Sequence, residues 1–530
     1  MSALTSLRTL IGVMKSSERK VAKKFLSSLN VHGEKSPRQV LLLFDLLCRE
    51  KKGEALLDDS QIESLIYNGR SGSTAFPRLI LRLKDKLGES LLLNVNITRP
   101  KSYSDRAKSL YLARKKLMLA QNLCGKGIWD WVLSLLGECI EEAKKYERYT
   151  IIIDAVTVRM EMKSADKGEI SYKIEDDLYN KAINCLLATK KARSYYSRLI
   201  SQTEFKAEVN NLHSLESNIK ELQNDLELTG SATVAYYLHY LEVHFYQEKK
   251  QFKRAADILK TQIELVEVHP ALYSPSRLVG ALVNMALNEI HTRRFVGALR
   301  YTKRIAKLIP EKHFNWLQCV EVNFHANFYS GKYKQALENI NFLLSHDLSS
   351  AALFRKGKRE YQKACVLFML KEFGQVNKLL IDLNPIEDDL EGWNLALRTL
   401  HIMSDLEQEK TEEAFYKIEN MRRILEKLKK NAAWNNPREV IKYDLLKTLA
   451  NTGFNFVEAR TRKLDELNKL AESTGVFSWR ILSPELVIFH QWYISKVFKQ
   501  NLVLKIPMNI EQNSKSLVEN ENEVPQLNNK

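Results

Sequence analysis

The sequence predicts an all-α protein built as a solenoid, in which stacked helical hairpins each bury one face against the next. Two observations predict this fold class. Glycine (19 residues) and proline (11 residues) are scarce in a chain of 530 residues, which disfavours the many tight turns of an all-β fold. A pairing of an aromatic with a small residue also recurs about every 40 residues in the second half of the chain. We therefore expect long helices joined by short loops.

The recurring pattern is an aromatic residue followed, after two further residues, by a small residue at the start of an amphipathic segment. In "YSGKYKQALENINFLL" (329–344), Gly331 is expected to end one helix and Tyr333 to pack at the start of the next. Ala336 would let that helix approach its neighbour closely. The small positions are 43, 38, 40 and 38 residues apart. The pattern is clear at Phe252/Ala255, Phe295/Ala298 and Tyr333/Ala336, it is degraded at Phe373/Val376 and Thr411/Ala414, and Trp129/Val132 is a sixth candidate earlier in the chain.

The segment "GKYKQA" (331–336) resembles the tetratricopeptide repeat family, whose hairpins carry Gly-x-Tyr-x-x-Ala into their second helix. Asn284, Met285 and Ala286 fit the first helix of that pattern, although the period here is longer than the family's 34 residues. The wider layout resembles that of uncharacterised bacterial cytoplasmic proteins with similar hairpins. The resemblance implies a right-handed α-solenoid with a helical cap, whose first helices line a concave groove for a protein or peptide.

Composition and helix signals divide the chain into five expected segments. Four helices are predicted in 16–94, with N-terminal caps at Ser36–Pro37 and at Ser60 with Glu63. Ser483–Pro484 is predicted to start the last helix. The segments are a basic helical subdomain (1–94), a linker region with degenerate repeats (95–230), the repeat array (231–430), capping helices (431–504) and a polar, disordered tail (505–530).

The sequence also predicts where the protein works. Its six cysteines are scattered and include no C-x-x-C pair, which is typical of a reducing compartment. It contains no run of 18 apolar residues and no signal peptide pattern. We therefore expect a cytoplasmic protein that has no membrane span.

The positive charge is concentrated near the N-terminus. Residues 1–120 hold 23 Lys/Arg and 11 Asp/Glu, so they carry +12 of the chain's net +17. Within this region Arg78, Arg82 and Lys86 recur at a spacing of four and share a helix face, and Lys84 adds charge nearby. This pattern fits a helix that binds nucleic acid, but the solvated face of an ordinary amphipathic helix is the favoured interpretation.

Catalytic and metal-binding patterns are missing from the sequence. The segment "GRSGS" (69–73) lacks the final glycine and the preceding strand of a nucleophile elbow. His239 and His244 are five residues apart, so they point about 140° away from each other on a helix. The sequence therefore predicts no enzyme, no cofactor and no metal site.

The leading hypothesis is a non-enzymatic scaffold or adaptor that binds a protein or peptide in the solenoid groove. The alternative is a nucleic-acid-linked regulator, in which basic N-terminal helices contact DNA or RNA and the repeats sense a partner. The sequence does not predict the oligomeric state. Asparagines spaced by four would bind a ligand's backbone or carboxylate with help from arginines, or they would simply fill polar surface. The candidates are Arg277, Asn284, Asn288, Arg300, Asn323 and Asn327.

Overall fold

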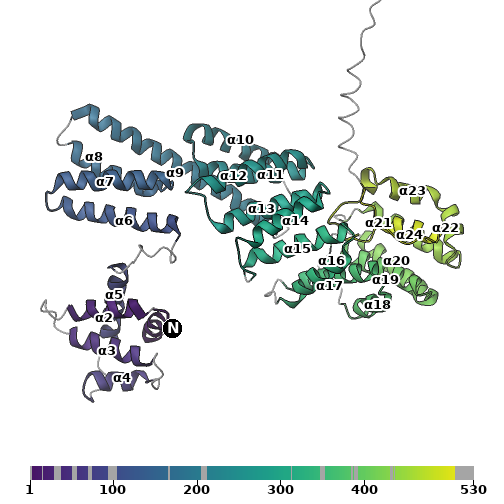
Figure 1. Cartoon of the computed structure of the whole chain (residues 1–530), viewed down its shortest axis with the longest axis horizontal. Coiled ribbons are helices and arrows are strands. Elements are labelled where there is room, and N and C mark those ends of the chain that lie inside the picture. Colours follow the sequence, from purple (N-terminus) through teal and green to yellow (C-terminus); the bar gives the residue numbers. More distant parts are fainter. Residues whose placement is uncertain are drawn as a thin grey trace, which may run out of the picture. The chain divides into compact units, whose positions relative to one another are not determined.

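In the structure, a computed structural model, every regular element of the described chain is a helix (Figure 1). It describes residues 3–507 except 15, 29–36, 51–56, 70–74, 94–103, 165–167, 205–211, 312, 347–351, 384–385, 387–388, 390–391, 430–433 and 435. Those residues form 24 α-helices and a short 3-10 helix and include no strand, which confirms the all-α prediction. None of these helices is long and apolar enough to cross a membrane. The predicted tail falls largely outside the described residues.

The chain divides into two compact units, Met1–Lys115 and Lys116–Lys530. The boundary that we predicted at residue 94 lies in a segment outside the described residues. In the first unit, five helices enclose a core of aliphatic side chains that includes Leu7, Leu26 and Leu83. These helices are α1 (Ala3–Val13), α2 (Ser16–Ser28), α3 (Pro37–Glu50), α4 (Asp59–Ile66) and α5 (Ala75–Leu93).

Helix α1 was not predicted from the sequence. Its residues Leu4, Leu7 and Ile11 recur at helical spacing, and each is only 1% exposed. They belong to the apolar core of the first unit. The signal for this helix was therefore present in the sequence and was overlooked.

The cap of helix α4 also differs from the prediction. Helix α4 is capped by Asp58 with Gln61, and not by Ser60 with Glu63. The backbone at Asp58 is extended, and the Asp58 carboxylate accepts a hydrogen bond from the backbone amide of Gln61. The side chain of Gln61 in turn accepts a hydrogen bond from the backbone amide of Asp58. The capping box was therefore predicted two residues too late.

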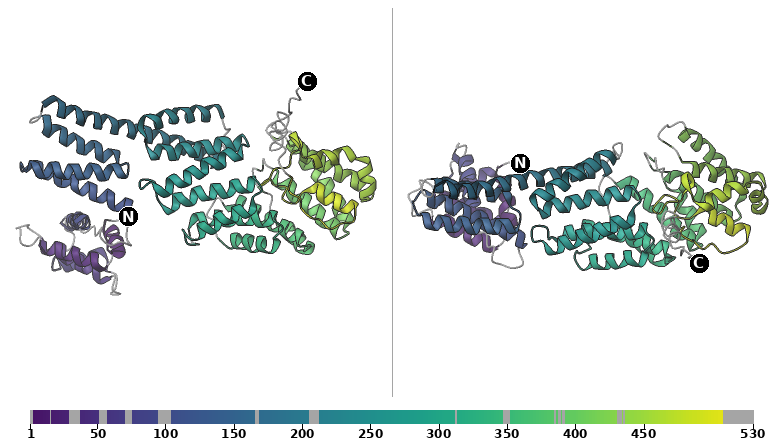
Figure 2. Two further views of the ribbon diagram at one scale, coloured as in Figure 1. Left: turned by 45° about the horizontal axis from the view of Figure 1, so that its top comes forward. Right: turned by 90° about the horizontal axis from the view of Figure 1, so that it is seen from above.

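The second unit begins with helices that pack in chain order (Figure 2). The 37-residue α9 contacts α8, α10 and α11, so one long helix supports three others. This explains why the pattern has no recognisable copies between Trp129 and Phe252. The helices of this region are α6 (Asp105–Cys124), which spans the boundary between the units, α7 (Trp129–Lys145), α8 (Tyr149–Ser164), α9 (Gly168–Glu204) and α10 (Leu212–Thr229).

Five hairpins follow, and the second helix of each begins with one of the five patterns from Phe252 onwards. The residue two places before each pattern has a positive φ between 57° and 73°: Lys250, Arg293, Gly331, Lys371 and Glu409. The helices are α11 (Ala232–Glu248) with α12 (Phe252–Val268), α13 (Pro275–His291) with α14 (Phe295–Ala306), α15 (Phe314–Tyr329) with α16 (Tyr333–Ser345), α17 (Ala352–Met369) with α18 (Phe373–Ile381), and α19 (Trp393–Glu407) with α20 (Thr411–Lys429).

The small residues of the pattern lie inside the hairpins. Ala255, Ala298 and Ala336, in the first turns of α12, α14 and α16, are each 0% exposed. No ligand can reach a side chain that is enclosed in this way. Ala255 and Ala298 therefore lie in the packed core of their hairpins, as expected for small residues that let two helices approach closely.

The aromatic residues of the pattern pack either against the next hairpin or within their own hairpin. Phe252 stacks on His291 with ring centroids 4.7 Å apart, and Phe295 stacks on Tyr329 at 5.9 Å. In both cases the partner ring lies at the end of the next hairpin's first helix. Tyr333 instead packs edge-on against a ring of its own hairpin, at 5.6 Å. These rings fix how far each helix pair is offset from the next.

The last described part of the chain consists of shorter helices and non-helical stretches. Ser483 and Pro484 do not start the last helix, which begins at Phe489. The carbonyl of Pro484 instead accepts a hydrogen bond from Tyr361, so this part of the chain follows its tertiary contacts. The elements are α21 (Pro437–Asn451), α22 (Phe456–Arg462), α23 (Leu464–Glu472), the 3-10 helix (Gly475–Phe477) and α24 (Phe489–Val497).

Candidate binding surface

Residues 481–488 form a non-helical stretch whose main chain is held by tyrosines from two hairpins. The hydroxyl of Tyr361, on α17, donates to the Pro484 carbonyl at 2.7 Å. The hydroxyl of Tyr329, at the end of α15, accepts from the Leu482 amide at 3.2 Å. Burial raises the pKa of both hydroxyls, so they stay protonated and polar without charge. Side chains of these first helices therefore bind non-helical main chain.

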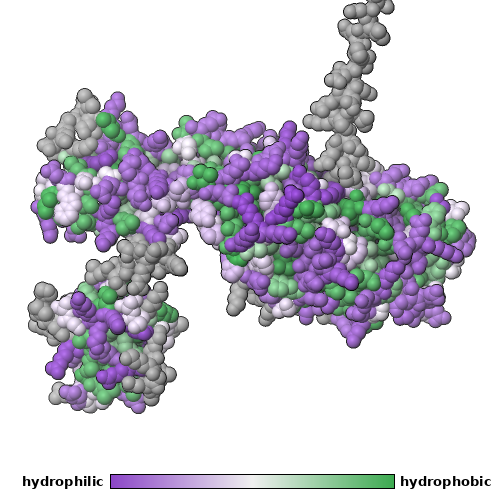
Figure 3. Space-filling view, in the orientation of Figure 1, coloured by the Kyte–Doolittle hydropathy of each residue, from purple (hydrophilic) through white to green (hydrophobic). Residues whose placement is uncertain are grey.

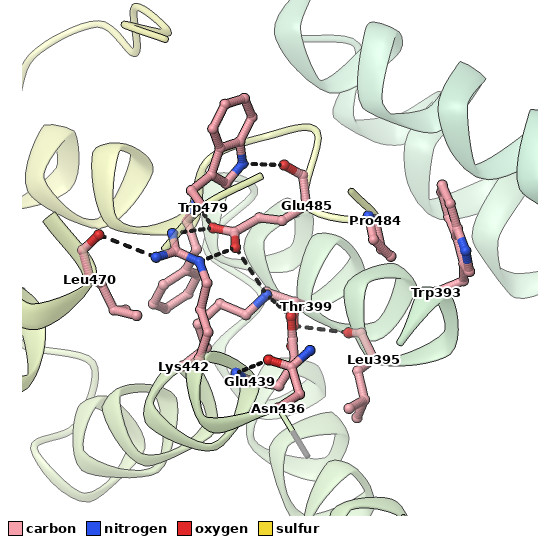
Figure 4. A network of polar contacts seen from close by, with 12 residues as sticks. Trp393, Leu395, Thr399, Asn436, Glu439, Lys442, Leu470, Trp479, Pro484 and Glu485 are labelled. Atoms are coloured by element: carbon pink, nitrogen blue, oxygen red, sulfur yellow. Dashed lines mark hydrogen bonds and ion pairs between the residues drawn. The ribbon is translucent and has the colours of Figure 1, made fainter. Parts of the chain in front are cut away.

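A buried ionic cluster fastens the other side of the same stretch (Figure 4). Arg438, near the start of α21, makes a two-pronged ion pair with Glu485, with nitrogen–oxygen distances of 2.6 and 3.0 Å. It also donates to the carbonyls of Leu470 and Phe477. Lys442, one turn along α21, lies 3.6 Å from Glu485. The cluster thus joins α21, α23 and the loop before α24.

The charges in this cluster largely satisfy one another. Burial alone would raise the pKa of Glu485, but Lys442 and Arg438 outweigh it and lower that pKa to about 2. Burial raises the pKa of Glu439, which pairs with Lys442, and the neighbouring Glu485 raises it further. A cavity of about 400 Å³ adjoins the cluster, yet Arg438 uses all its nitrogens on protein partners. We therefore interpret the cluster as a structural contact that holds these elements together, and not as a ligand-binding site.

Residues 501–507 form a second extended stretch that lies on the array beyond α24. Leu502, Leu504 and Ile506 are partly buried against the main core, and their side chains alternate with more exposed neighbours. This alternation is the pattern of an extended strand with one face covered. The stretch is not paired with another strand among the described residues.

Side chains supply the polar partners of this second stretch. The side-chain amide of Gln491 donates to the Lys505 carbonyl at 2.6 Å and accepts from the Lys505 backbone amide at 2.8 Å. Arg293, in the turn between α13 and α14, donates to the Pro507 carbonyl at 2.8 Å. Lys371, at the matching turn between α17 and α18, donates to the Asn501 side chain at 2.7 Å. The stretch therefore follows the turns of the hairpins.

Most of the predicted groove residues contact other parts of the protein. Asn288 is fully buried and donates to the Phe252 carbonyl at 3.0 Å, so its side chain joins two hairpins. Asn323 accepts from Thr302 at 2.6 Å, and Asn327 donates to a side chain of α16 at 3.0 Å. Each of these asparagines serves the packing of first helices on second helices.

The other three groove candidates differ from one another. Arg277 donates to the carbonyls of Ala271 and Leu272 and lies over an aromatic ring of α11, 5.4 Å from its centroid. Arg300 is exposed on α14, which is a second helix. Asn284 is partly exposed on α13, and no described residue hydrogen-bonds to its side chain. Asn284 is thus the candidate best placed to meet a ligand.

The predicted nucleic-acid residues lie on the outer side of α5. Arg78, Arg82 and Lys84 are exposed, and Lys86 pairs with a glutamate of the same helix at 3.2 Å. The leucines of the adjacent face, including Leu83, are buried in the core of the first unit. This arrangement agrees with either interpretation of the helix.

Sequence reasoning missed the residues that hold the extended stretches, namely Arg293, Tyr329, Tyr361 and Gln491. Tyr361 and the proline that it binds are 123 residues apart in the chain, and no local pattern marks them. The one usable signal was the cluster of apolar residues at 502–504 and 506, which the prediction of capping helices and a tail overlooked.

The visible face of the second unit is mainly polar, with apolar residues scattered between the polar ones (Figure 3). The chain matches no protein-family model, and no curated protein is significantly similar to it.

Proposed function

We propose that this protein is a non-enzymatic, cytoplasmic scaffold that binds a protein or peptide in extended form. In this proposal the five hairpins form a right-handed, tetratricopeptide-like solenoid, as the Gly-x-Tyr-x-x-Ala pattern of one of them suggests. The first helices line a groove, and Asn284 contacts the ligand there. The layout that resembles bacterial cytoplasmic proteins supports the location.

The observation that carries the proposal is the capture of the chain's own extended stretches. Arg293, Tyr329 and Tyr361 come from successive first helices or their turns, and each hydrogen-bonds main-chain atoms of 481–507. Side chains that recognise main chain in this way place little demand on the sequence that they bind. Hydrogen bonds of this kind, from side chains to main chain, could equally be made to an extended segment of another protein.

The test compares two asparagines on one helix. Proteins that co-purify with the full chain are quantified for wild type, Asn284→Ala and Asn288→Ala, and melting temperatures are measured in parallel. We expect Asn284→Ala to weaken capture of a specific partner and leave the melting temperature unchanged. Full capture by a stably folded Asn284→Ala variant, or the absence of any protein partner together with turnover of metabolites, would contradict the proposal.

Nucleic-acid binding by the first unit is the second candidate function, and the excess of +12 in residues 1–120 favours it. Binding of the full chain to duplex and single-stranded probes should then fall steeply with salt. Replacing Arg78 and Arg82 with glutamine should lower the slope of that dependence. If affinity does not change with salt or with these substitutions, the candidate fails.

A further inference from the structure

A separate cavity of about 350 Å³ lies between the last two hairpins of the array. Its walls come from α18 and from Leu383 just beyond it, from α19, and from one lysine of α20. One side is apolar and the other is basic. Leu380, Ile381, Leu383 and Leu397 form the apolar side, and Arg398, His401 and Lys417 form the basic side.

Arg398 is the unusual feature of this cavity. The side chain is half-buried, and no described residue offers it a carboxylate or a carbonyl acceptor. Burial lowers the pKa of Arg398, and no acid among the described residues compensates for it. A guanidinium remains charged at any ordinary pH and favours oxyanions as partners. Among the described residues, the charge of Arg398 therefore has no counter-charge in the cavity.

His401 provides an independent second observation. It is only 9% exposed, and its Nε2 atom is buried without a hydrogen-bond partner among the described residues. Buried polar atoms in folded proteins are nearly always paired, so an unpaired one that lines a cavity points to a ligand. Arg398 and His401 lie on the same helix, three residues apart, and share a face.

The other polar residues of the cavity already have partners. Lys417 pairs with the buried Asp405, which also accepts from Asn377. Asn394 uses both ends of its amide on the main chain of Ile386, at 2.7 and 2.8 Å. With Lys417 neutralised by Asp405, the residues that line the cavity keep one net positive charge, which is that of Arg398.

We propose that this cavity binds a small organic anion, whose carboxylate or phosphate head pairs with Arg398 and His401 and whose apolar body lies against Leu380 and Leu397. Its volume falls at the lower end of the roughly 300–1,000 Å³ that ligand pockets occupy. The site lies between α18 and α19 and uses none of the contacts with the extended stretches. Its occupancy is therefore separate from the proposed protein-binding function.

The test uses calorimetric titration of the full chain with hexanoate, hexyl phosphate, inorganic phosphate and hexanol. We expect the first two to bind saturably, inorganic phosphate more weakly, and hexanol not at all. The ratio of the hexanoate and hexyl phosphate affinities identifies which head group the site prefers. Hexanol binding as tightly as hexanoate, or no saturable binding by either amphiphilic anion, would overturn the proposal.

Three variants make the test specific. Arg398→Gln should weaken hexanoate binding at least about tenfold, because a charge-assisted hydrogen bond is lost. Arg423→Gln, which removes an exposed arginine of α20 outside the cavity, should leave binding unchanged. Ile381 is 70% exposed, so Ile381→Ser should keep the fold intact while weakening hexanoate more than inorganic phosphate. Equal affinity in wild type and Arg398→Gln would refute the site.

The histidine supplies a readout that a merely structural cavity would not give. Burial and the charges of Lys417, Arg398 and Lys410 lower the pKa of His401 to about 4, and Asp405 opposes them. A bound anion stabilises the imidazolium, so ligand should raise this pKa in NMR titrations of labelled histidine. An unshifted His401 resonance at saturating hexanoate would count against the proposal.

Discussion

At the scale of single residues, the buried ionic cluster around Glu485 shows how a few charges fix a non-helical segment. Arg438 can only donate hydrogen bonds, so the Nδ1 atom of His490, 3.3 Å away, must accept. His490 is therefore neutral, with its proton on Nε2. Burial, together with the Arg438 charge, lowers its pKa to about 4, although Glu485 acts in the opposite direction.

This neutral histidine predicts a specific dependence on pH. Because the folded pKa lies below the unfolded value of about 6.5, the contribution of His490 is complete above pH 6.5 and is lost as the pH falls towards 4. The unfolding free energies of wild type and His490→Gln should converge by up to about 1.4 kcal/mol per pH unit over this range. Urea denaturation at pH 7, 6 and 5 measures this convergence. A constant difference would show that His490 does not titrate as described.

Ala336 tests close packing at a single position. Its side chain is fully buried at the start of α16, so Ala336→Leu should overpack the hairpin and destabilise the protein by about 1–3 kcal/mol. Gln335 is exposed on the same turn, and Gln335→Leu is the matched control with an expected effect below about 0.5 kcal/mol. Chemical denaturation gives both values. Equal stability of the two variants would mean that Ala336 does not lie at a tight contact.

The equivalent positions in the two preceding hairpins should respond in the same way. Ala255 and Ala298 are as fully buried as Ala336, so we expect a leucine at either position to overpack its hairpin by a similar amount. Their burial agrees with the packing role that their place in the repeated pattern predicts.

At the scale of elements, the hairpin pattern was predictable because its causes are local. A turn residue with positive φ, an aromatic residue (a threonine in the last hairpin) and a small residue act within six positions, and the five patterns from Phe252 onwards each start a second helix. Helix α1 also had a visible local signal. The loop before α24 was mispredicted because Ser483–Pro484 matches a cap locally, whereas Tyr329, Tyr361 and Arg438 determine its path from far away in the chain.

The turn position predicts opposite effects for two substitutions. Lys250 has a φ of 57°, which strains a residue with a side chain, so Lys250→Gly should stabilise the protein by about 0.5–1 kcal/mol. Gly331 has a φ of 73° and open space around it, so Gly331→Ala should destabilise by about 1 kcal/mol through backbone strain alone. Thermal unfolding of both variants checks the signs. If both substitutions change the stability in the same direction, the positive φ of these residues does not determine the stability of the turns.

Asn288 provides a further test, because it links two elements. Asn288→Ala removes the donor to the Phe252 carbonyl and should cost about 1–3 kcal/mol. Asn284→Ala, one helical turn away, should change the stability by less than about 0.5 kcal/mol. Urea denaturation distinguishes them. Equal losses would mean that Asn284 also has a structural role and is not free for a ligand.

At the scale of the whole molecule, the array binds segments of its own chain that are neither helical nor paired as strands. The sequence could predict the repeated helices, because each repeat carries its own signal. It could not predict the binding residues, because Arg293 and the carbonyl that it binds are 214 positions apart and meet only in the folded array. Four of the six groove candidates, Arg277, Asn288, Asn323 and Asn327, proved to contact the array itself, since polar residues at helical spacing also serve packing.

The most direct test of the account is binding of the second extended stretch in trans. A chain ending at Phe498 keeps every described helix, and circular dichroism and thermal unfolding establish that it is folded. A synthetic peptide of residues 499–507 should bind this shortened protein saturably, and Gln491→Ala should weaken that binding by about tenfold. A folded protein that binds the peptide no better than a scrambled one would contradict the claim that the helical array recognises extended chain.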